Sequence, residues 1–317
     1  MNEKTIIENI QNGDTLALSK AITLCESTLE MEQKIAQNII EALSEKNGNS
    51  IRIGVTGVPG VGKSTFINSF GKMLTSKGKK VAVLAIDPTS EKTQGSILGD
   101  KSRMDELATD KNAFIRPSPT GGTLGGVANK SRENIILCEA AGFDVILIET
   151  VGVGQSETTV SNLVDFFLLL MLAGAGDELQ GIKRGIMEMA DAILINKADG
   201  DNVQKAKNAM LQYKSALHLF PALQNGWTPQ VNTCSALEKI GLKEIWETIE
   251  KHNSQMRANG FFTENRKEQN NFWLHRQIKE ELGNKKYAQL ETSGVLKRLE
   301  EKLLNKKATI YQLLEDL

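Results

Sequence analysis

At 317 residues the chain is long enough for one large domain with appendages or for two domains. Its formal net charge of −1 provides no global positive field, so composition gives no reason to expect nucleic acid or a membrane surface as a partner. The three cysteines are scattered, and no apolar run is long enough for a secretion signal or a membrane span, so we expect a reduced, cytoplasmic protein.

Residues 1–48 are expected to form a helical N-terminal segment. Asp14 is a typical helix N-cap, and apolar residues at helical spacing follow it. A second helix is predicted over residues 30–43, before the polar linker at 44–50. We expect this segment to pack against the core, and a partner-docking surface is the alternative.

Residues 51–65 carry the motif around which the rest of the chain is organised. Ile51, Ile53 and Val55 alternate as in a short buried strand, a glycine-rich turn follows, and apolar residues then recur at helical spacing. A strand, a glycine turn and a helix N-terminus in this order are the context of a phosphate-binding loop, although a glycine turn can match the pattern by chance. The predicted loop consists of Gly57, Val58, Pro59, Gly60, Val61, Gly62, Lys63, Ser64 and Thr65.

The chemistry of this loop suits a nucleoside triphosphate. Its glycines allow backbone N–H groups to turn inward, and the positive end of the following helix dipole favours phosphate. Lys63 can reach the β- and γ-phosphate oxygens, and the hydroxyl of Ser64 can ligate Mg²⁺.

Apolar runs that alternate with helical patterns continue to about residue 260. Such a series predicts an α/β fold of the P-loop NTPase type, with a mostly parallel sheet covered by helices on both faces. The nucleotide domain is therefore expected over residues 49–260. After the strand that precedes the loop, strands are expected at 81–87, 113–117, 144–150, 165–173, 191–197 and 230–236, and helices at 130–141, 183–189 and 203–219.

Residues 261–317 are rich in charged and amide side chains around a narrow apolar stripe. A stripe of this kind suits a helix that packs on another helix rather than into a globular core. We expect a helical arm for self-association into a homodimer. The alternative is a helical hairpin folded back on its own domain.

The segment 196–199 predicts that the base is guanine. Asp199 can accept hydrogen bonds from both N1–H and the exocyclic amine of guanine, a donor pair that adenine lacks. Asn196 is expected to contact the base edge, and the stem of Lys197 can lie over the ring. Alone this pattern is weak, but its place at a strand end downstream of a phosphate loop makes it specific. The next base-contacting loop is expected at Ser235, Ala236 and Leu237, where backbone N–H groups would meet the guanine oxygen.

Acidic residues at strand ends are the candidates for a Mg²⁺ site, because ligands of parallel sheets bind beyond the carboxyl ends of the strands. Glu149 ends an apolar run, and its long side chain suggests a water-bridged metal contact. Asp87 also follows an apolar run. It is a better candidate than Asp100, because an acidic residue such as Asp100 is usually just a solvated surface residue.

Hydrolysis is expected to be slow in the isolated protein. The N–H of Gly152 can sense the γ-phosphate, but no glutamine follows it directly, and Gln155 lies further on. A partner or a loop closure would therefore have to accelerate the reaction.

The motifs GVPGVGKST, AIDPTS, SILGDKSRM, FIRPSPTGGTLGG, ETVGVGQSE, GDELQGIKRG and NKADGD, in this order, resemble the MeaB/ArgK family of G3E GTPases. This is the methylmalonyl-CoA mutase-associated GTPase family, to which the human methylmalonic aciduria type A protein is related. The resemblance implies a homodimeric chaperone that binds GTP, GDP and Mg²⁺. It further implies that the chaperone gates adenosylcobalamin delivery to methylmalonyl-CoA mutase, or a related acyl-CoA mutase, and protects that enzyme from inactivation.

The resemblance also implies roles for individual residues. It places Ser64, Asp87, Asp100 and Glu149 around Mg²⁺, and it makes residues 172–183 an additional switch with Lys183 as its working residue. The candidates for catalysis are then Lys63, Glu149, Gln155 and Lys183. Many relatives have an arginine where this chain has Gly121 and Gly122, so no catalytic cation is assigned to that loop.

Other functions fit the sequence less well. A kinase of amino-acid transport would need a kinase catalytic segment, and guanine selectivity argues against it. A nickel-inserting metallochaperone would need a histidine-rich or paired-cysteine segment, and a protein-targeting GTPase would need a methionine-rich domain. The chain has only three histidines and three separated cysteines.

Overall fold

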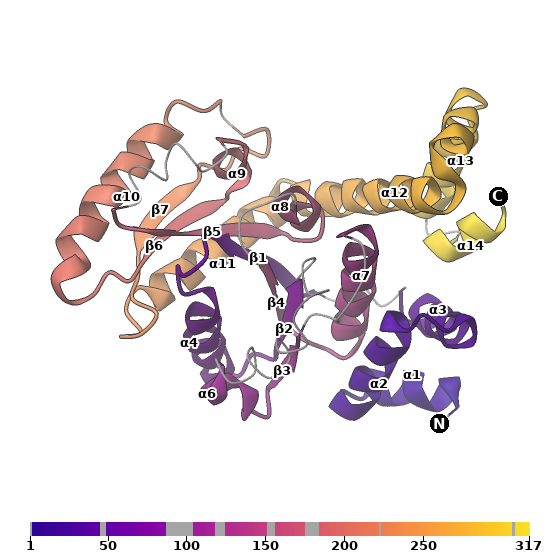
Figure 1. Ribbon diagram of the computed structural model, residues 1–317, viewed down its shortest axis with the longest axis horizontal. Coiled ribbons are helices and arrows are strands. Elements are labelled where there is room, and N and C mark those ends of the chain that lie inside the picture. Colours follow the sequence, from indigo (N-terminus) through magenta and orange to yellow (C-terminus); the bar gives the residue numbers. More distant parts are fainter. Residues whose placement is uncertain are drawn as a thin grey trace. The chain divides into compact units, whose positions relative to one another are not determined.

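The computed structural model describes residues 2–44, 49–86, 104–117, 124–150, 156–174, 184–221, 223–305 and 308–317. The chain forms two compact units (Figure 1). The helical unit comprises residues 1–49, 123–142 and 263–317, and the sheet unit comprises residues 50–122 and 143–262. No helix among the described residues is long and apolar enough to cross a membrane.

The sheet unit is built on a seven-stranded sheet with the order β3-β2-β4-β1-β5-β6-β7. All its strand pairs are parallel, which confirms the expected α/β fold. Each strand coincides with one of the apolar runs. The strands are β1 (Ile51–Gly57), β2 (Val81–Ile86), β3 (Ala113–Arg116), β4 (Val145–Thr150), β5 (Phe166–Leu172), β6 (Ala192–Asn196) and β7 (Gln230–Thr233).

Burial on both faces explains why the strands are continuous apolar runs rather than alternating ones. Every residue of β4 and β6 is buried. β1 lies at the centre of the sheet, between β4 and β5. The helices of this unit are α4 (Lys63–Ser76), α6 (Asp105–Ala108), α8 (Ser156–Ser161), α9 (Arg184–Met189), α10 (Val203–Leu217) and α11 (Leu242–Ala258), with a 3₁₀ turn η2 (Gly200–Asn202).

Helix α4 is central to the sheet unit because it begins at the phosphate loop. It contacts β1, β2 and β4, and it packs against α6 and α11. Phe66 and Phe70 of α4 stack with ring centroids 5.1 Å apart, and Phe70 meets Trp246 of α11 at 6.1 Å. The rings bury the inner face of the helix and fix its N-terminus beside the end of β1.

The helical unit combines segments from three parts of the chain. Its helices are α1 (Glu3–Gln11), α2 (Thr15–Glu26), α3 (Glu30–Ser44), α7 (Leu124–Ala140), α12 (Phe261–Thr292), α13 (Val295–Leu304) and α14 (Ile310–Glu315). Asp14 caps α2 as expected, because its Oδ1 accepts hydrogen bonds from the N–H groups of Leu16 (2.8 Å) and Ala17 (3.3 Å). Helix α7 lies between β3 and β4 in sequence, but it packs on α2 and α3 within this unit.

The C-terminal segment folds back on helices of its own chain. Gly283 interrupts α12 with φ 75° and ψ 164°, and His275 then contacts both Tyr287 and Glu300 at 2.8 Å. Ile310 and Leu313 of α14 are buried. These contacts are those of the hairpin alternative, and self-association of the arm remains a prediction.

Candidate nucleotide-binding site

The phosphate loop connects β1 directly to α4, as the sequence predicted. Gly57 has φ 152°, and a Cβ atom there would lie 2.4 Å from the carbonyl oxygen of Leu170 in β5. Gly62 caps α4 with φ 93°, and its Cβ would lie 2.9 Å from Nδ2 of Asn196. Both positions therefore need glycine, because the backbone is left-handed or closely approached there.

Two side chains of the phosphate loop make contacts expected at a phosphate and metal site. Lys63 Nζ donates to the carbonyl oxygen of Gly57 at 2.8 Å, so the ammonium group lies over the loop. Ser64 Oγ donates to Oε1 of Glu149 at 3.0 Å. Glu149 is buried near the end of β4, in register with Val55 of β1. The structure thus brings together two of the predicted Mg²⁺ ligands, and their hydroxyl and carboxylate oxygens are donors that this hard cation prefers.

The remaining predicted residues of the phosphate side lie outside the described residues. They are Asp87, Asp100, Gly152, Gln155 and Lys183.

Asn196 lies at the end of β6 with its side chain turned inward. Its Nδ2 donates to the carbonyl oxygen of Val61 at 2.8 Å, and its Oδ1 accepts from the N–H of Ala236 at 3.2 Å. Asn196 is only 1% exposed. This side chain connects the phosphate loop to the loop that follows β7, and its contact with the base edge stays a prediction.

Lys197 makes a second contact with the phosphate loop, at the surface. Its Nζ donates to the carbonyl oxygen of Gly60 at 2.8 Å, so its stem runs from the end of β6 to the phosphate loop. Lys197 has φ 59°, an uncommon conformation for a residue with a Cβ, and Asn202 Nδ2 donates to its carbonyl oxygen at 2.7 Å.

The loop after β7 is closed and is attached to Asp199. The N–H of each of Ser235 and Ile240 donates to the carbonyl oxygen of the other at 3.0 Å. Ser235 Oγ donates to Oδ2 of Asp199 and accepts from the N–H of Glu238 at 3.0 Å. The structure therefore places the two predicted guanine-binding segments side by side, with the carboxylate of Asp199 at their junction.

Two residues that sequence reasoning missed also hold this loop. Cys234 Sγ donates to Oδ1 of Asn196 at 3.3 Å, and burial, with the nearby charge of Asp199, raises the pKa of this thiol to about 12. Ser69 of α4 donates from Oγ to the carbonyl oxygen of Ala236 at 2.7 Å. A serine within an amphipathic helix gives no sequence signal for such a contact.

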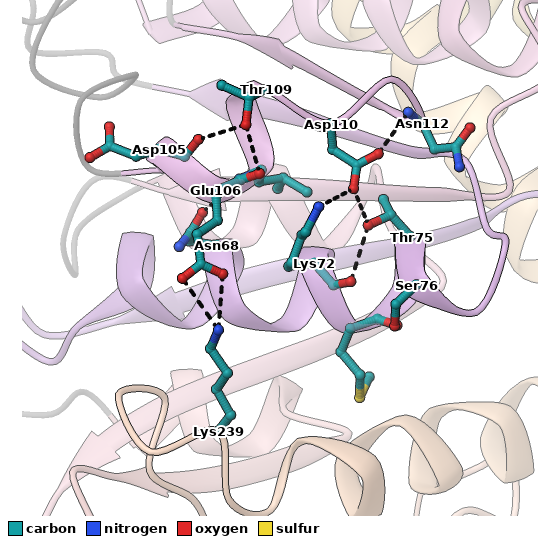
Figure 2. A network of polar contacts seen from close by, with 12 residues as sticks. Asn68, Lys72, Thr75, Ser76, Asp105, Glu106, Thr109, Asp110, Asn112 and Lys239 are labelled. Carbon is teal, nitrogen blue, oxygen red and sulfur yellow. Dashed lines mark hydrogen bonds and ion pairs between the residues drawn. The ribbon is translucent and has the colours of Figure 1, made fainter.

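Helix α6 packs on α4, the helix that carries Ser69 (Figure 2). Asn68 Oδ1 accepts from the N–H of Leu107 at 3.0 Å, and the side chain of Leu107 fills the space beside Gly71, where a Cβ would lie 2.6 Å from Cδ2 of this leucine. Lys239 of the loop after β7 forms an ion pair with Glu106 of α6 at 2.9 Å. α4 is thus in contact with α6 and, through Ser69, with the loop after β7.

The sequence is similar to known proteins over most of its length. The family described as methylmalonyl-CoA mutase-associated GTPase MeaB matches residues 18–291. The chain is 48% identical to the GTPase ArgK of Escherichia coli (strain K12) over 291 residues, 91% of this chain and 88% of that protein. It is 46% identical to the mitochondrial methylmalonic aciduria type A homolog of Mus musculus over 278 residues, 84% of this chain and 67% of that protein.

A solved structure extends the similarity to the fold. The crystal structure of a LAO/AO transport system kinase superposes on this chain with a TM-score of 0.78 at 39% sequence identity. The match covers 100% of this chain and 97% of the kinase chain. The parallel sheet, with the loop between β1 and α4, is that expected of a P-loop GTPase. The chain belongs to the MeaB family of methylmalonyl-CoA mutase-associated GTPases.

Proposed function

We propose that the protein is a Mg²⁺-dependent GTPase that gates adenosylcobalamin loading into methylmalonyl-CoA mutase, or a related acyl-CoA mutase, and protects that enzyme. Nucleotide binding is supported by one connected set of contacts at the carboxyl edge of the sheet. Asn196 joins the phosphate loop to the loop after β7, and that loop is joined to Asp199. A site organised in this way can hold the phosphates and the base of one nucleotide.

Ser64 and Glu149 are the described residues that would hold Mg²⁺, with Asp87 and Asp100 as further expected ligands. When bound, the ion neutralises charge on the β- and γ-phosphate oxygens. Lys63 would bind the same oxygens, and the buried carboxylate of Glu149 would orient the hydroxyl of Ser64. Gln155 and Lys183 stay predicted contributors to hydrolysis, since they lie outside the described residues.

The proposal that the mutase is the partner rests on the descriptions of similar proteins and not on a contact in the structure. The matching family is described as mutase-associated, and the murine relative is a methylmalonic aciduria type A homolog. A partner that prefers one nucleotide state must, by linkage, change nucleotide affinity in return, typically by about 1–3 kcal/mol. We further propose that the protein acts in the cytoplasm and as a homodimer.

Steady-state phosphate release with and without the mutase from the same source tests this function. We expect slow hydrolysis by the isolated protein and a clear acceleration by the mutase. Lys183→Ala should weaken the acceleration more than it weakens GTP binding. Lys214→Ala, which removes an exposed lysine of α10, is the matched control and should retain the acceleration. If no cobalamin mutase of that organism forms a complex with the protein or changes its rate of hydrolysis, the proposed client is wrong.

A second candidate function is phosphoryl transfer to a protein of amino-acid transport. The name of the similar solved structure, a LAO/AO transport system kinase, favours it. The two functions differ in the acceptor of the γ-phosphate. Incubation with γ-labelled GTP should release the label as inorganic phosphate if the acceptor is water, and should leave it on protein if the chain is a kinase.

A further inference from the structure

A buried hydrogen bond joins helix α4 to the loop after β7. Ser69 is 5% exposed, and its Oγ donates to the carbonyl oxygen of Ala236, which is itself 2% exposed. Serine and threonine side chains in helices commonly donate to carbonyl groups of their own helix. Ser76 of α4 donates in this way to the carbonyl oxygen of Met73 at 2.7 Å. Ser69 instead reaches a residue 167 positions away in the sequence.

This hydrogen bond determines where the next backbone N–H points. The described residues contain no cis peptide, so the peptide between Ala236 and Leu237 is trans. The C=O and N–H bonds of a trans peptide point in opposite directions. Because the carbonyl group of Ala236 is directed at α4, the N–H of Leu237 is directed away from α4. Leu237 itself is 73% exposed.

We propose that Ser69 is a positioning residue for guanine selectivity. It fixes the peptide plane of Ala236 and thereby presents the N–H of Leu237 to the oxygen at position 6 of guanine. The inference rests on the proposed function, because it deepens the description of the same nucleotide site. Ser69 touches no nucleotide atom itself.

The location of the loop supports this role. Ser235 donates to Asp199, the carboxylate that would accept from N1–H and the exocyclic amine of guanine. The N–H of Leu237 belongs to the same short loop, which is closed by the backbone pair of Ser235 and Ile240. An N–H donor at this place favours guanine, which presents an oxygen acceptor at position 6, over adenine, which presents an amino donor there.

Calorimetric titration with two nucleotides isolates this contribution. GDP carries the oxygen at position 6, whereas the 5′-diphosphate of 2-aminopurine riboside lacks this oxygen and the N1–H but retains the exocyclic amine and the phosphates. Because the missing N1–H affects every variant alike, the change in the ratio of affinities between variants reports on position 6. In Ser69→Ala we expect the affinity for GDP to fall about fivefold, as for the loss of one neutral hydrogen bond. The affinity for the 2-aminopurine nucleotide should be almost unchanged, so the ratio of the two affinities should contract.

Two further variants separate positioning from a general weakening of the fold. Ser69→Thr keeps the hydroxyl and should restore most of the ratio. Ser76→Ala removes a hydroxyl from the same helix (Figure 2) whose hydrogen bond stays within α4, and it should leave the ratio unchanged. Thermal unfolding of each variant shows whether a lowered affinity reflects lost stability, which would lower the affinities for both nucleotides alike.

The inference is overturned if Ser69→Ala leaves the ratio of affinities unchanged. Should that variant not fold, the unmodified protein supplies the second measurement. Equal affinity of the unmodified protein for GDP and the 2-aminopurine nucleotide would show that no donor reads position 6, and would overturn the inference as well. Failure of the unmodified protein to bind GDP at all would instead contradict the proposed function, and this inference with it.

Discussion

Individual buried polar residues hold the candidate site together. Asn196 and Ser69 lie in the interior, and each makes a hydrogen bond to a segment far away in the sequence. Removing one partner of a buried hydrogen bond leaves the other unsatisfied, at a cost of about 1–3 kcal/mol. The loops that would contact the nucleotide are therefore held in place by the interior of the protein.

Gly57 and Gly60 of the phosphate loop should differ in their tolerance of a methyl group. Gly57→Ala would place Cβ 2.4 Å from a carbonyl oxygen of β5, so a central strand must shift. Gly60→Ala meets no atom within 4 Å and bears only the strain of φ 77°, about 1–2 kcal/mol. In chemical denaturation we expect Gly57→Ala to lower the free energy of unfolding by clearly more than Gly60→Ala does. Equal losses would mean that the close approach of β1 and β5 is wrong.

Asp199→Asn should move base preference from guanosine toward xanthosine nucleotides. The amide would donate to the oxygen at position 2 of xanthine instead of accepting from the amine of guanine. Its oxygen could still accept from the hydroxyl of Ser235, so the loop contact is retained. Competition between GTP and xanthosine triphosphate measures the change. A variant that keeps the full preference for GTP would contradict the role of Asp199.

At the scale of elements, the strands were the most predictable part of the fold. Each strand of the parallel sheet is buried on both faces, so the sequence shows it as an apolar run. Helix α11 was not predicted, and the sequence placed the start of α7 at residue 130 rather than Leu124. The two hydrogen bonds of Asn196 could not be predicted, because they depend on how β6, β7 and the phosphate loop lie relative to one another. The contact of Ser69 joins residues 167 positions apart, which no local pattern shows.

The connection between α4 and the start of β3 should depend on pH. Asp110 accepts hydrogen bonds from Lys72 Nζ (2.6 Å), the N–H of Asn112 (2.9 Å) and Thr75 Oγ1 (2.7 Å) (Figure 2). The contact with Lys72 contributes most to lowering the pKa of Asp110 from 3.8 to about 2. The unfolded chain therefore takes up this proton at a higher pH than the folded protein. The stabilisation is present above about pH 4 and is lost as the pH falls toward 2.

Unfolding free energies measured from pH 6 to pH 2 test this linkage. Asp110→Asn should be less stable than the unmodified protein at pH 6, and the difference should shrink as the pH falls through the interval between about 4 and 2. Lys72→Met keeps the carboxylate but removes its main partner, so it should reproduce most of the loss. A difference that stays constant with pH would show that Asp110 acts by packing alone.

At the scale of the whole molecule, the two ends of the chain meet in the helical unit. Lys34 of α3 forms an ion pair with Glu315 of α14, and Tyr311 donates a hydrogen bond to Glu133 of α7. Burial raises the pKa of Glu133, and Tyr311 is itself buried. The C-terminal segment is therefore part of the core of the helical unit, whereas the sheet unit has strands and a core of its own.

Removal of the C-terminal arm should separate nucleotide binding from self-association. A chain that ends at Gly260 keeps the whole described sheet and the phosphate loop, so we expect it to bind GDP with affinity close to that of the full chain. It loses the buried side chains of Ile310 and Leu313, so the helical unit should unfold at a lower temperature. If the arm forms the proposed dimer, light scattering should show a dimer for the full chain and a monomer for the shortened one.

Phe272→Glu distinguishes loss of the dimer from loss of the helical unit. Phe272 is 37% exposed on α12 in the single chain, so a charge at this position disturbs the intramolecular core less than a truncation does. A dimer held by exposed apolar surface of the arm should dissociate in this variant while the helical unit keeps its unfolding temperature, because a buried unpaired charge at an interface is strongly unfavourable. A shortened chain that is still dimeric would place the interface outside the arm. A monomeric full chain would mean that the apolar stripe of the arm serves only the fold of its own chain.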